Sequence, residues 1–149
     1  MRWLRTVGAL LAIAVLFAIG WNFYMWLHRQ DDRSVQSISC MHTVEHIGLG
    51  RYGDPLDPLG DRKAAAELAR VLAPGGSLLF VVPVGAPQIM FNAHRIYSYE
   101  QVLELFPSLT LREFALIPEH GEDGGLIRHA DPALVASQGY GCGCFHFTC

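Results

Sequence analysis

The apolar residues of this 149-residue chain gather most densely near its N-terminus. Thr6–Leu27 is a run of 22 residues without a charged side chain. As a helix it would be about 33 Å long, enough to cross a hydrocarbon core of roughly 30 Å. Trp3 and Trp26 stand near its two ends, where aromatic rings settle at membrane interfaces. The pattern predicts a single-pass membrane anchor over residues 6–27, within an N-terminal segment of residues 1–29.

Two other interpretations of this segment stay open. Val7–Ile19 also resembles the apolar region of a cleaved signal peptide, and Ala18-Ile19-Gly20 resembles its cleavage site. The run also fits a buried core helix, or sequence outside any native fold. Two arginines precede it and two follow it, so the positive-inside rule selects no orientation.

Residues 30–149 change to the pattern of an α/β domain. Val35–Cys40 is a short mixed run suited to a strand. Arg62–Leu72 carries apolar residues at the spacing of one helix face, and Pro74-Gly75-Gly76 ends that helix. Leu78–Val82 is continuously apolar, as in a strand buried on both faces. Strand, helix and strand in this order predict a right-handed βαβ unit.

The remainder of the domain adds one helix and two strands. Ser98 and Gln101 form a capping-box pattern at the start of a helix over Tyr99–Phe106. Leu109–Ile117 and Cys142–Thr148 have strand patterns, and the glycine-rich stretch between them is expected to be a loop. We therefore predict an α/β fold, a partial Rossmann-like sheet of about four strands with two helices, behind one N-terminal apolar helix.

Polar side chains follow the first two predicted strands. In open α/β sheets, ligands bind beyond the carboxyl ends of the strands, and neighbouring parallel strands bring their loops together. Imidazoles and a carboxylate in such a group are suited to general acid/base work near neutral pH. Alternatively, the same residues orient a loop and form a hydrogen-bonded turn. The candidate catalytic residues are Glu45, His46 and His94, and the candidate substrate-binding residues are His42, Asn92, Arg95 and Tyr97.

Three aspartates, Asp54, Asp57 and Asp61, form a carboxylate series. The alternating pattern of a calcium loop is absent and prolines interrupt the run. Turn formation and helix capping account for them better, with Asp61 as the N-cap of the first predicted helix. No metal site is predicted here.

Three of the four cysteines crowd the C-terminus, which is poor geometry for a disulfide-stapled scaffold. We expect reduced thiols and an α/β domain on the cytoplasmic side of the membrane. Cys142, Cys144 and His146 alternate, so a strand would place them on one face, with Cys149 nearby. Successive same-face residues stand about 6–7 Å apart, too far for tight chelation without a bend. Packed free thiols are favoured over a metal site.

Charge excludes one class of partner. The net charge is −3 and no run of lysine or arginine is present to follow a phosphate backbone. Nucleic acid is therefore not an expected partner.

The longest motif resembles a known family. It reads Ser39-Cys40-Met41-His42-Thr43-Val44-Glu45-His46-Ile47-Gly48-Leu49-Gly50-Arg51-Tyr52-Gly53-Asp54. Later pieces resemble the same family: Leu72-Ala73-Pro74-Gly75-Gly76, Phe91-Asn92-Ala93-His94-Arg95-Ile96-Tyr97 and Gly141-Cys142-Gly143-Cys144-Phe145. The family is domain-of-unknown-function family number 268, and the resemblance covers about Asp31 to the C-terminus. That family in turn resembles the class I S-adenosylmethionine-dependent methyltransferases.

The resemblance implies a fold and a cofactor. Val35–Cys40 would be the fourth strand of a methyltransferase fold, Ser77–Val82 the fifth, Leu109–Ile117 the sixth and Cys142–Thr148 the seventh. S-adenosylmethionine would be the cofactor. No G-x-G motif lies upstream of Val35, however, so the resemblance also implies that the methyl-donor half is missing, as in a truncated domain.

Three hypotheses of function follow. The first is a methyltransferase-like domain acting on a small acceptor, with a partner chain completing the sheet and the donor site. The second is a non-catalytic, membrane-tethered remnant or interaction module. The third is a thiol or metal-binding protein that uses the C-terminal cysteines.

Overall fold

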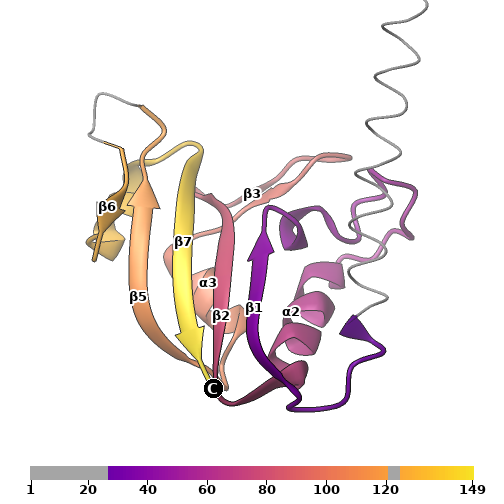
Figure 1. Ribbon diagram of the computed structural model, residues 1–149. Helices are drawn as coiled ribbons and strands as arrows, with labels where there is room; N and C mark the ends of the chain where they lie inside the picture. The colour runs from indigo at the N-terminus through magenta and orange to yellow at the C-terminus, as the bar shows by residue number, and fades with distance from the viewer. Residues whose placement is uncertain (1–26, 121–124) are drawn as a thin grey trace, which may run out of the picture.

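The computed structural model describes residues 27–120 and 125–149, which form a mixed sheet with helices on one side (Figure 1). The main sheet has five strands in the order β1-β2-β7-β5-β6. The first pair is parallel and the others are antiparallel. The strands are β1 (Val35–Met41), β2 (Leu72–Val84), β5 (Thr110–Ile117), β6 (Ile127–Arg128) and β7 (Gly141–Thr148).

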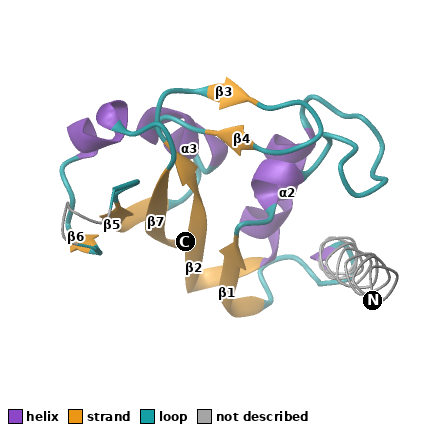
Figure 2. Ribbon diagram, turned by 90° about the horizontal axis from the view of Figure 1, so that it is seen from above, coloured by secondary structure: helices purple, strands orange, loops and turns teal. Residues whose placement is uncertain are grey.

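Two α-helices cover one face of this sheet, as Figures 1 and 2 show. Helix α2 (Gly60–Val71) joins β1 to β2, and α3 (Tyr99–Leu105) follows β2. Shorter elements are the 3-10 helices η1 (Val44–His46) and η3 (Pro132–Ser137) and the two-stranded sheet of β3 (Gln88–Ile89) and β4 (Arg95–Ile96).

The core lies between the sheet and these helices. Leu68 of α2 is fully buried, as are Leu78 and Phe80 of β2. Phe106 packs edge-on against Phe80 at 4.9 Å and tilted against Phe147 of β7 at 5.0 Å. The alternate residues of the strands face the other way. This second face is open in the described part of the chain, and Met41, Leu79 and Ile117 on it are 61%, 47% and 41% exposed.

Most predicted elements are confirmed within one or two residues at their ends. The strand–helix–strand order β1-α2-β2 is present with its parallel pairing. The capping box of Ser98 and Gln101 at the start of α3 is present as well. Both predictions rest on local patterns, namely apolar periodicity and side-chain capping. Tertiary contacts did not override these patterns.

Other predictions were wrong. The main sheet has five strands, because Ile127 and Arg128 in the predicted loop pair with the end of β5. A two-residue strand has no readable period, so only the pairing reveals it. Leu59, not Asp61, is the N-cap of α2. The Pro-Gly-Gly segment that was expected to end the helix lies inside β2, where Gly75 takes a φ of 71° at an irregularity of the β1–β2 register.

The predicted membrane anchor, residues 6–27, lies outside the described residues except for its last member. Leu27 is 1% exposed and belongs to the core cluster, and its carbonyl accepts a hydrogen bond of 3.0 Å from Arg70 Nη2. Among residues 27–120 and 125–149, no helix has the length and apolarity to cross a membrane.

Candidate functional site

The loops after β1 and β2 meet at one edge of the sheet, as the parallel pairing predicts. His46 Nδ1 lies 2.6 Å from the carbonyl oxygen of Ala93. Arg51 Nη1 donates a 2.9 Å hydrogen bond to the carbonyl of Asn92, which has a φ of 53° and an exposed side chain. Because a carbonyl only accepts, the Nδ1 of His46 must carry a proton. The structure therefore brings together residues 47 positions apart in the sequence.

Glu45 is the buried centre of this edge, with a side chain that is 1% exposed. Its Oε1 lies 3.1 Å from His42 Nδ1 and 3.8 Å from His46 Nε2. Its Oε2 is buried and has no hydrogen-bond partner among the described residues. Burial raises the pKa of Glu45 to about 7, against a smaller lowering by His46. A carboxyl group that titrates near neutral pH is suited to acid/base chemistry.

His42 reaches across the end of β2 toward β7. Its backbone is left-handed, with a φ of 49°, and its N–H donates to the carbonyl of Val81. Its Nε2 lies 3.6 Å from Cys142 Sγ. Burial lowers the pKa of His42, so the neutral imidazole is favoured. A non-glycine residue in this conformation is strained by about 1–3 kcal/mol, and such strain clusters at functional sites.

His94 lies beside His46 and completes the group. The two rings are edge-on with centroids 6.2 Å apart, and the ring of Tyr140 is edge-on to that of His94 with centroids 5.2 Å apart. The Nε2 of His94 is the second buried side-chain atom without a hydrogen-bond partner in the part of the chain that the structure describes. Two such atoms at one edge are notable because buried polar groups are nearly always paired.

Arg95 and Tyr97 point inward, beneath these residues. Arg95 Nη1 donates to the carbonyls of Ile47 at 2.7 Å and Glu45 at 3.3 Å. Its Nε lies 3.4 Å from Asp61 Oδ2, and the Tyr97 hydroxyl donates to that same carboxylate oxygen at 3.1 Å. These side chains hold the two loops in place. That they also contact a substrate stays a prediction.

Asp61 was missed as a member of this network. Its place before an amphipathic run predicts a helix cap, whereas its side chain is buried between Arg95 and Tyr97. Its partner Tyr97 is 36 residues away, so no local pattern marks the contact.

The predicted turn-forming role of Asp54 is confirmed in the glycine loop after η1, although the nest of amides around it was not predicted. Gly48, Gly50 and Gly53 have φ values of 81°, 73° and 79° and stand at G-x-G-x-x-G spacing. The backbone N–H groups of Gly48, Gly50 and Tyr52 donate to the Asp54 carboxylate at 2.7, 3.4 and 3.2 Å. The loop is thus a nest of amides of the kind that binds anions, filled by the chain's own carboxylate. The glycine spacing was the available signal.

The cysteines lie as the alternating pattern predicts. Cys142, Cys144 and His146 of β7 share the open face, and His146 Nε2 lies 3.2 Å from Ser77 Oγ. All four cysteines are free thiols. Within the described ranges no three His, Cys, Asp or Glu side chains are grouped as metal ligands. The structure therefore gives the metal-binding hypothesis no support.

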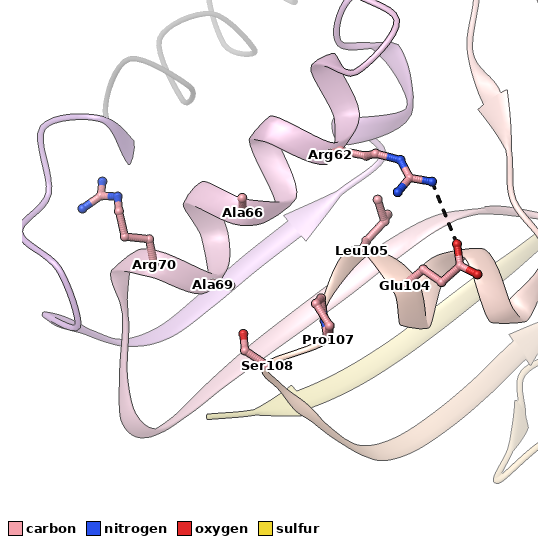
Figure 3. Close-up of a pocket in the computed structure, with 8 residues that line it drawn as sticks. All are labelled: Arg62, Ala66, Ala69, Arg70, Glu104, Leu105, Pro107 and Ser108. Carbon is pink, nitrogen blue, oxygen red and sulfur yellow. Dashed lines mark ion pairs between the residues drawn. The ribbon is translucent and has the colours of Figure 1, made fainter.

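A separate groove lies on the helical side, between α2 and α3 (Figure 3). Its volume is about 430 Å³. Arg62 and Glu104 face each other across it at 3.9 Å, as the dashed line in Figure 3 marks. It is lined by Arg62, Ala66, Ala69, Arg70, Glu104, Leu105, Pro107 and Ser108. None of the predicted site residues lines this groove.

The fold is similar to those of solved structures that include two methyltransferases. The cyclase SpnF matches with a TM-score of 0.50 and 16% identity, over 80% of this chain and 52% of that one. An S-adenosylmethionine-dependent methyltransferase of Thermotoga maritima matches with a TM-score of 0.49 and 15% identity, over 80% and 58% of the two chains. A Haloferax volcanii methyltransferase, solved in complex with a methyltransferase activator, gives 0.48 and 17%, over 80% and 56%. The chain spans between half and three-fifths of these structures.

The particular family is shown by the sequence. The family described as the Caenorhabditis protein of unknown function, DUF268, matches residues 16–111, and the chain belongs to it. No curated protein matches the sequence.

Proposed function

We propose that this chain forms the acceptor-binding side of a methyltransferase-like enzyme, with Glu45, His42 and His46 as its acid/base group. One observation carries the proposal. A buried carboxyl group, with one oxygen unpartnered among the described residues, stands between two imidazoles at the carboxyl ends of β1 and β2. Ligands of open α/β sheets bind at that edge.

The exposed fractions of the three side chains favour different roles for them in proton transfer. Transfer of a methyl group to an N–H or O–H acceptor releases a proton, which a base must take. Glu45 is 1% exposed, whereas the side chains of His42 and His46 are 45% and 23% exposed. The imidazoles therefore face the acceptor, and Glu45 stabilises the imidazolium that forms. His94, with its unpartnered Nε2, is the hydrogen-bonding group beside them.

The residues described here do not fit the methyl donor. The resemblance names S-adenosylmethionine, whose amino-acid carboxylate would need free backbone amides at a glycine turn. The amides of the glycine loop are already bound to Asp54. We therefore assign no step to the donor in this chain, and we propose that a partner chain supplies its site.

The open edge of β1 supports such a partner. Among the described residues β1 pairs only with β2, so its other edge presents unpaired backbone groups. Edges of this kind readily pair with another strand. Met41 at the end of β1 is also exposed.

Two measurements test the proposal. Calorimetric titration of the full chain with S-adenosylmethionine is expected to show no binding, and a saturable isotherm would overturn the assignment of the donor site to a partner. Thermal unfolding with small amines, phenols and carboxylates is expected to reveal one stabilising class. That stabilisation should be lost in Glu45→Gln and kept in the exposed control Glu104→Gln. If no class stabilises the chain, or if Glu45→Gln responds as the parent does, the acceptor site is refuted.

A further inference from the structure

A thiol, an imidazole and a carboxyl group lie in contact at the carboxyl ends of β1 and β2. His42 Nε2 lies 3.6 Å from Cys142 Sγ, and His42 Nδ1 lies 3.1 Å from Glu45 Oε1. Cys142 belongs to the start of β7, 100 positions after His42, so only the sheet brings the two together. The order thiol, imidazole, carboxyl is that of an activated nucleophile whose base is oriented by a third group.

The contacts of His42 decide which ring nitrogen faces the thiol. An ionised Glu45 only accepts hydrogen bonds, so Nδ1 of His42 carries the proton and Nε2 keeps its lone pair. Burial lowers the pKa of His42, which keeps the ring neutral and able to accept a proton. The Cys144 thiol and burial raise the pKa of Cys142, so this thiol is protonated at neutral pH and needs a base.

The burial of Glu45 favours transfer of that proton. Its side chain is 1% exposed, and its Oε2 has no hydrogen-bond partner among the described residues. A buried carboxylate is costly unless a cation pairs with it. Conversion of His42 to an imidazolium places such a cation 3.1 Å from Glu45 Oε1.

Apolar side chains flank the thiol on the open face of the sheet. Cys142 is opposite Pro83 of β2 and Ile117 of β5, and residues paired in this way share one face. Cys142 is partly buried and Ile117 is 41% exposed, so a small molecule can reach the sulfur from this face. Glu45 acts on the thiol with a negative charge. These surroundings favour an uncharged reagent over an anionic one.

We propose that Cys142 is a nucleophilic thiol that uncharged alkyl electrophiles modify covalently, with His42 as its base and Glu45 as the positioning residue of His42. This activity goes beyond the acceptor-binding function proposed above. It shares His42 and Glu45 with that site.

One step transfers the alkyl group. The proton of the Cys142 thiol passes to His42 Nε2, and Sγ attacks the electrophilic carbon of the reagent. An S–C bond forms, the bond from that carbon to its leaving group breaks, and the leaving group departs as an anion with the electron pair. The products are a thioether on Cys142, an imidazolium on His42 and the released anion. No oxidant or reductant takes part.

Alkylation of the full chain with iodoacetamide, followed by peptide mass mapping, tests the thiol and its base. At about pH 8 Cys142 should be labelled, and in His42→Asn its rate constant should fall roughly tenfold or more. Asparagine tolerates the left-handed backbone of this position, so the fold should be kept, which an unchanged melting temperature checks. The exposed Cys149 is the control within the same chain and should react at the parent's rate. An unlabelled Cys142 in the parent, an unchanged rate in the variant, or a parallel fall at Cys149 would refute the proposal.

Iodoacetate tests the preference for an uncharged reagent. Its carboxylate is repelled by Glu45, so the ratio of the iodoacetamide rate to the iodoacetate rate should be larger at Cys142 than at Cys149. The comparison with Cys149 cancels the intrinsic difference between the two reagents. Equal ratios at the two thiols would overturn the assignment of the reagent class.

The pH profile tests the role of Glu45. The rate constant at Cys142 should rise through pH 7, where Glu45 ionises, and Glu45→Gln should remove this rise without changing the profile of Cys149. A purely structural role would not move the profile, so a parent-like profile in the variant would exclude Glu45 from the mechanism. The other titratable groups around these three residues are Cys40, His46, Arg95, Tyr97, Tyr140 and Cys144. None of these assays needs an acceptor or a methyl donor, so failure here is distinguishable from failure of the proposed function.

Discussion

The Tyr97 hydroxyl donates a 3.1 Å hydrogen bond to the Asp61 carboxylate, which joins the end of the loop after β2 to the first turn of α2. Arg95 lies on the other side of this carboxylate, with Nε 3.4 Å from Oδ2, and both charged side chains are less than one-tenth exposed. Arg95 then holds the backbone of Glu45 and Ile47. The loop that carries the proposed acid/base group is therefore held in place by a buried ionic network.

We predict that Asp61→Ala is strongly destabilising. Removal of one partner leaves the Arg95 charge buried, which costs about 3–5 kcal/mol. Urea unfolding should show this loss in the free energy of unfolding. The exposed pair of Arg62 and Glu104, at 3.9 Å, is the matched control, and Glu104→Gln should cost less than about 0.5 kcal/mol. Equal losses in the two variants would show that the buried network is not what holds the loops.

The pKa of Glu45 predicts how stability changes with pH. Burial raises this pKa from its ordinary value to about 7, so the folded chain binds more protons than the unfolded chain between pH 4.5 and 7. Stability from this group is therefore lost as pH rises through that window. Glu45→Gln removes this pH dependence. The free energy of unfolding of the variant, relative to that of the parent, should therefore rise by about 2 kcal/mol between pH 5 and pH 8. Parallel curves for the two proteins would contradict the raised pKa.

Gly48 is predicted to be irreplaceable. It has a φ of 81°, and a Cβ there would lie 2.0 Å from the carbonyl oxygen of Asp57. Gly48→Ala should cost more than about 2 kcal/mol, because a backbone atom must move as well. Gly75 has a φ of 71° and open space around it, so Gly75→Ala should cost about 1 kcal/mol. Thermal unfolding of the two variants separates the steric effect from the conformational one.

The amide nest around Asp54 predicts rescue by an anion. Asp54→Ala removes the acceptor of three backbone N–H groups and should cost about 2 kcal/mol. Sulfate should restore part of this stability by occupying the nest. The rise in melting temperature with sulfate, relative to chloride at equal ionic strength, should be larger in the variant than in the parent. The same rise in both proteins would argue against a nest.

Leu27 is predicted to belong to the α/β domain. It is 1% exposed within the core, so Leu27→Ala should cost about 2–5 kcal/mol in the free energy of unfolding. Met41, 61% exposed, is the control, and Met41→Ala should be close to neutral. A neutral Leu27→Ala would place the start of the domain further along the chain.

The sequence by itself determined the elements whose signals are local. The apolar run of β2, the single apolar face of α2 and the capping box of α3 each predict one structure, because the pattern that marks each of them lies within a few neighbouring residues. The shared face of Cys142 and Cys144 follows from the two-residue period of a strand, and the meeting of the first two loops follows from parallel pairing.

Tertiary structure alone decided what those elements bring together. Asp61 became a buried partner of Tyr97 instead of a helix cap, and His42 came within 3.6 Å of a thiol 100 residues away. Such contacts depend on the order of the strands in the sheet and on the left-handed backbone of His42, which lets its side chain reach past β2 to β7. Neither is encoded in a local periodicity of the sequence. The chemistry of the edge, a carboxyl group with a raised pKa between two imidazoles, likewise exists only once burial removes water from it.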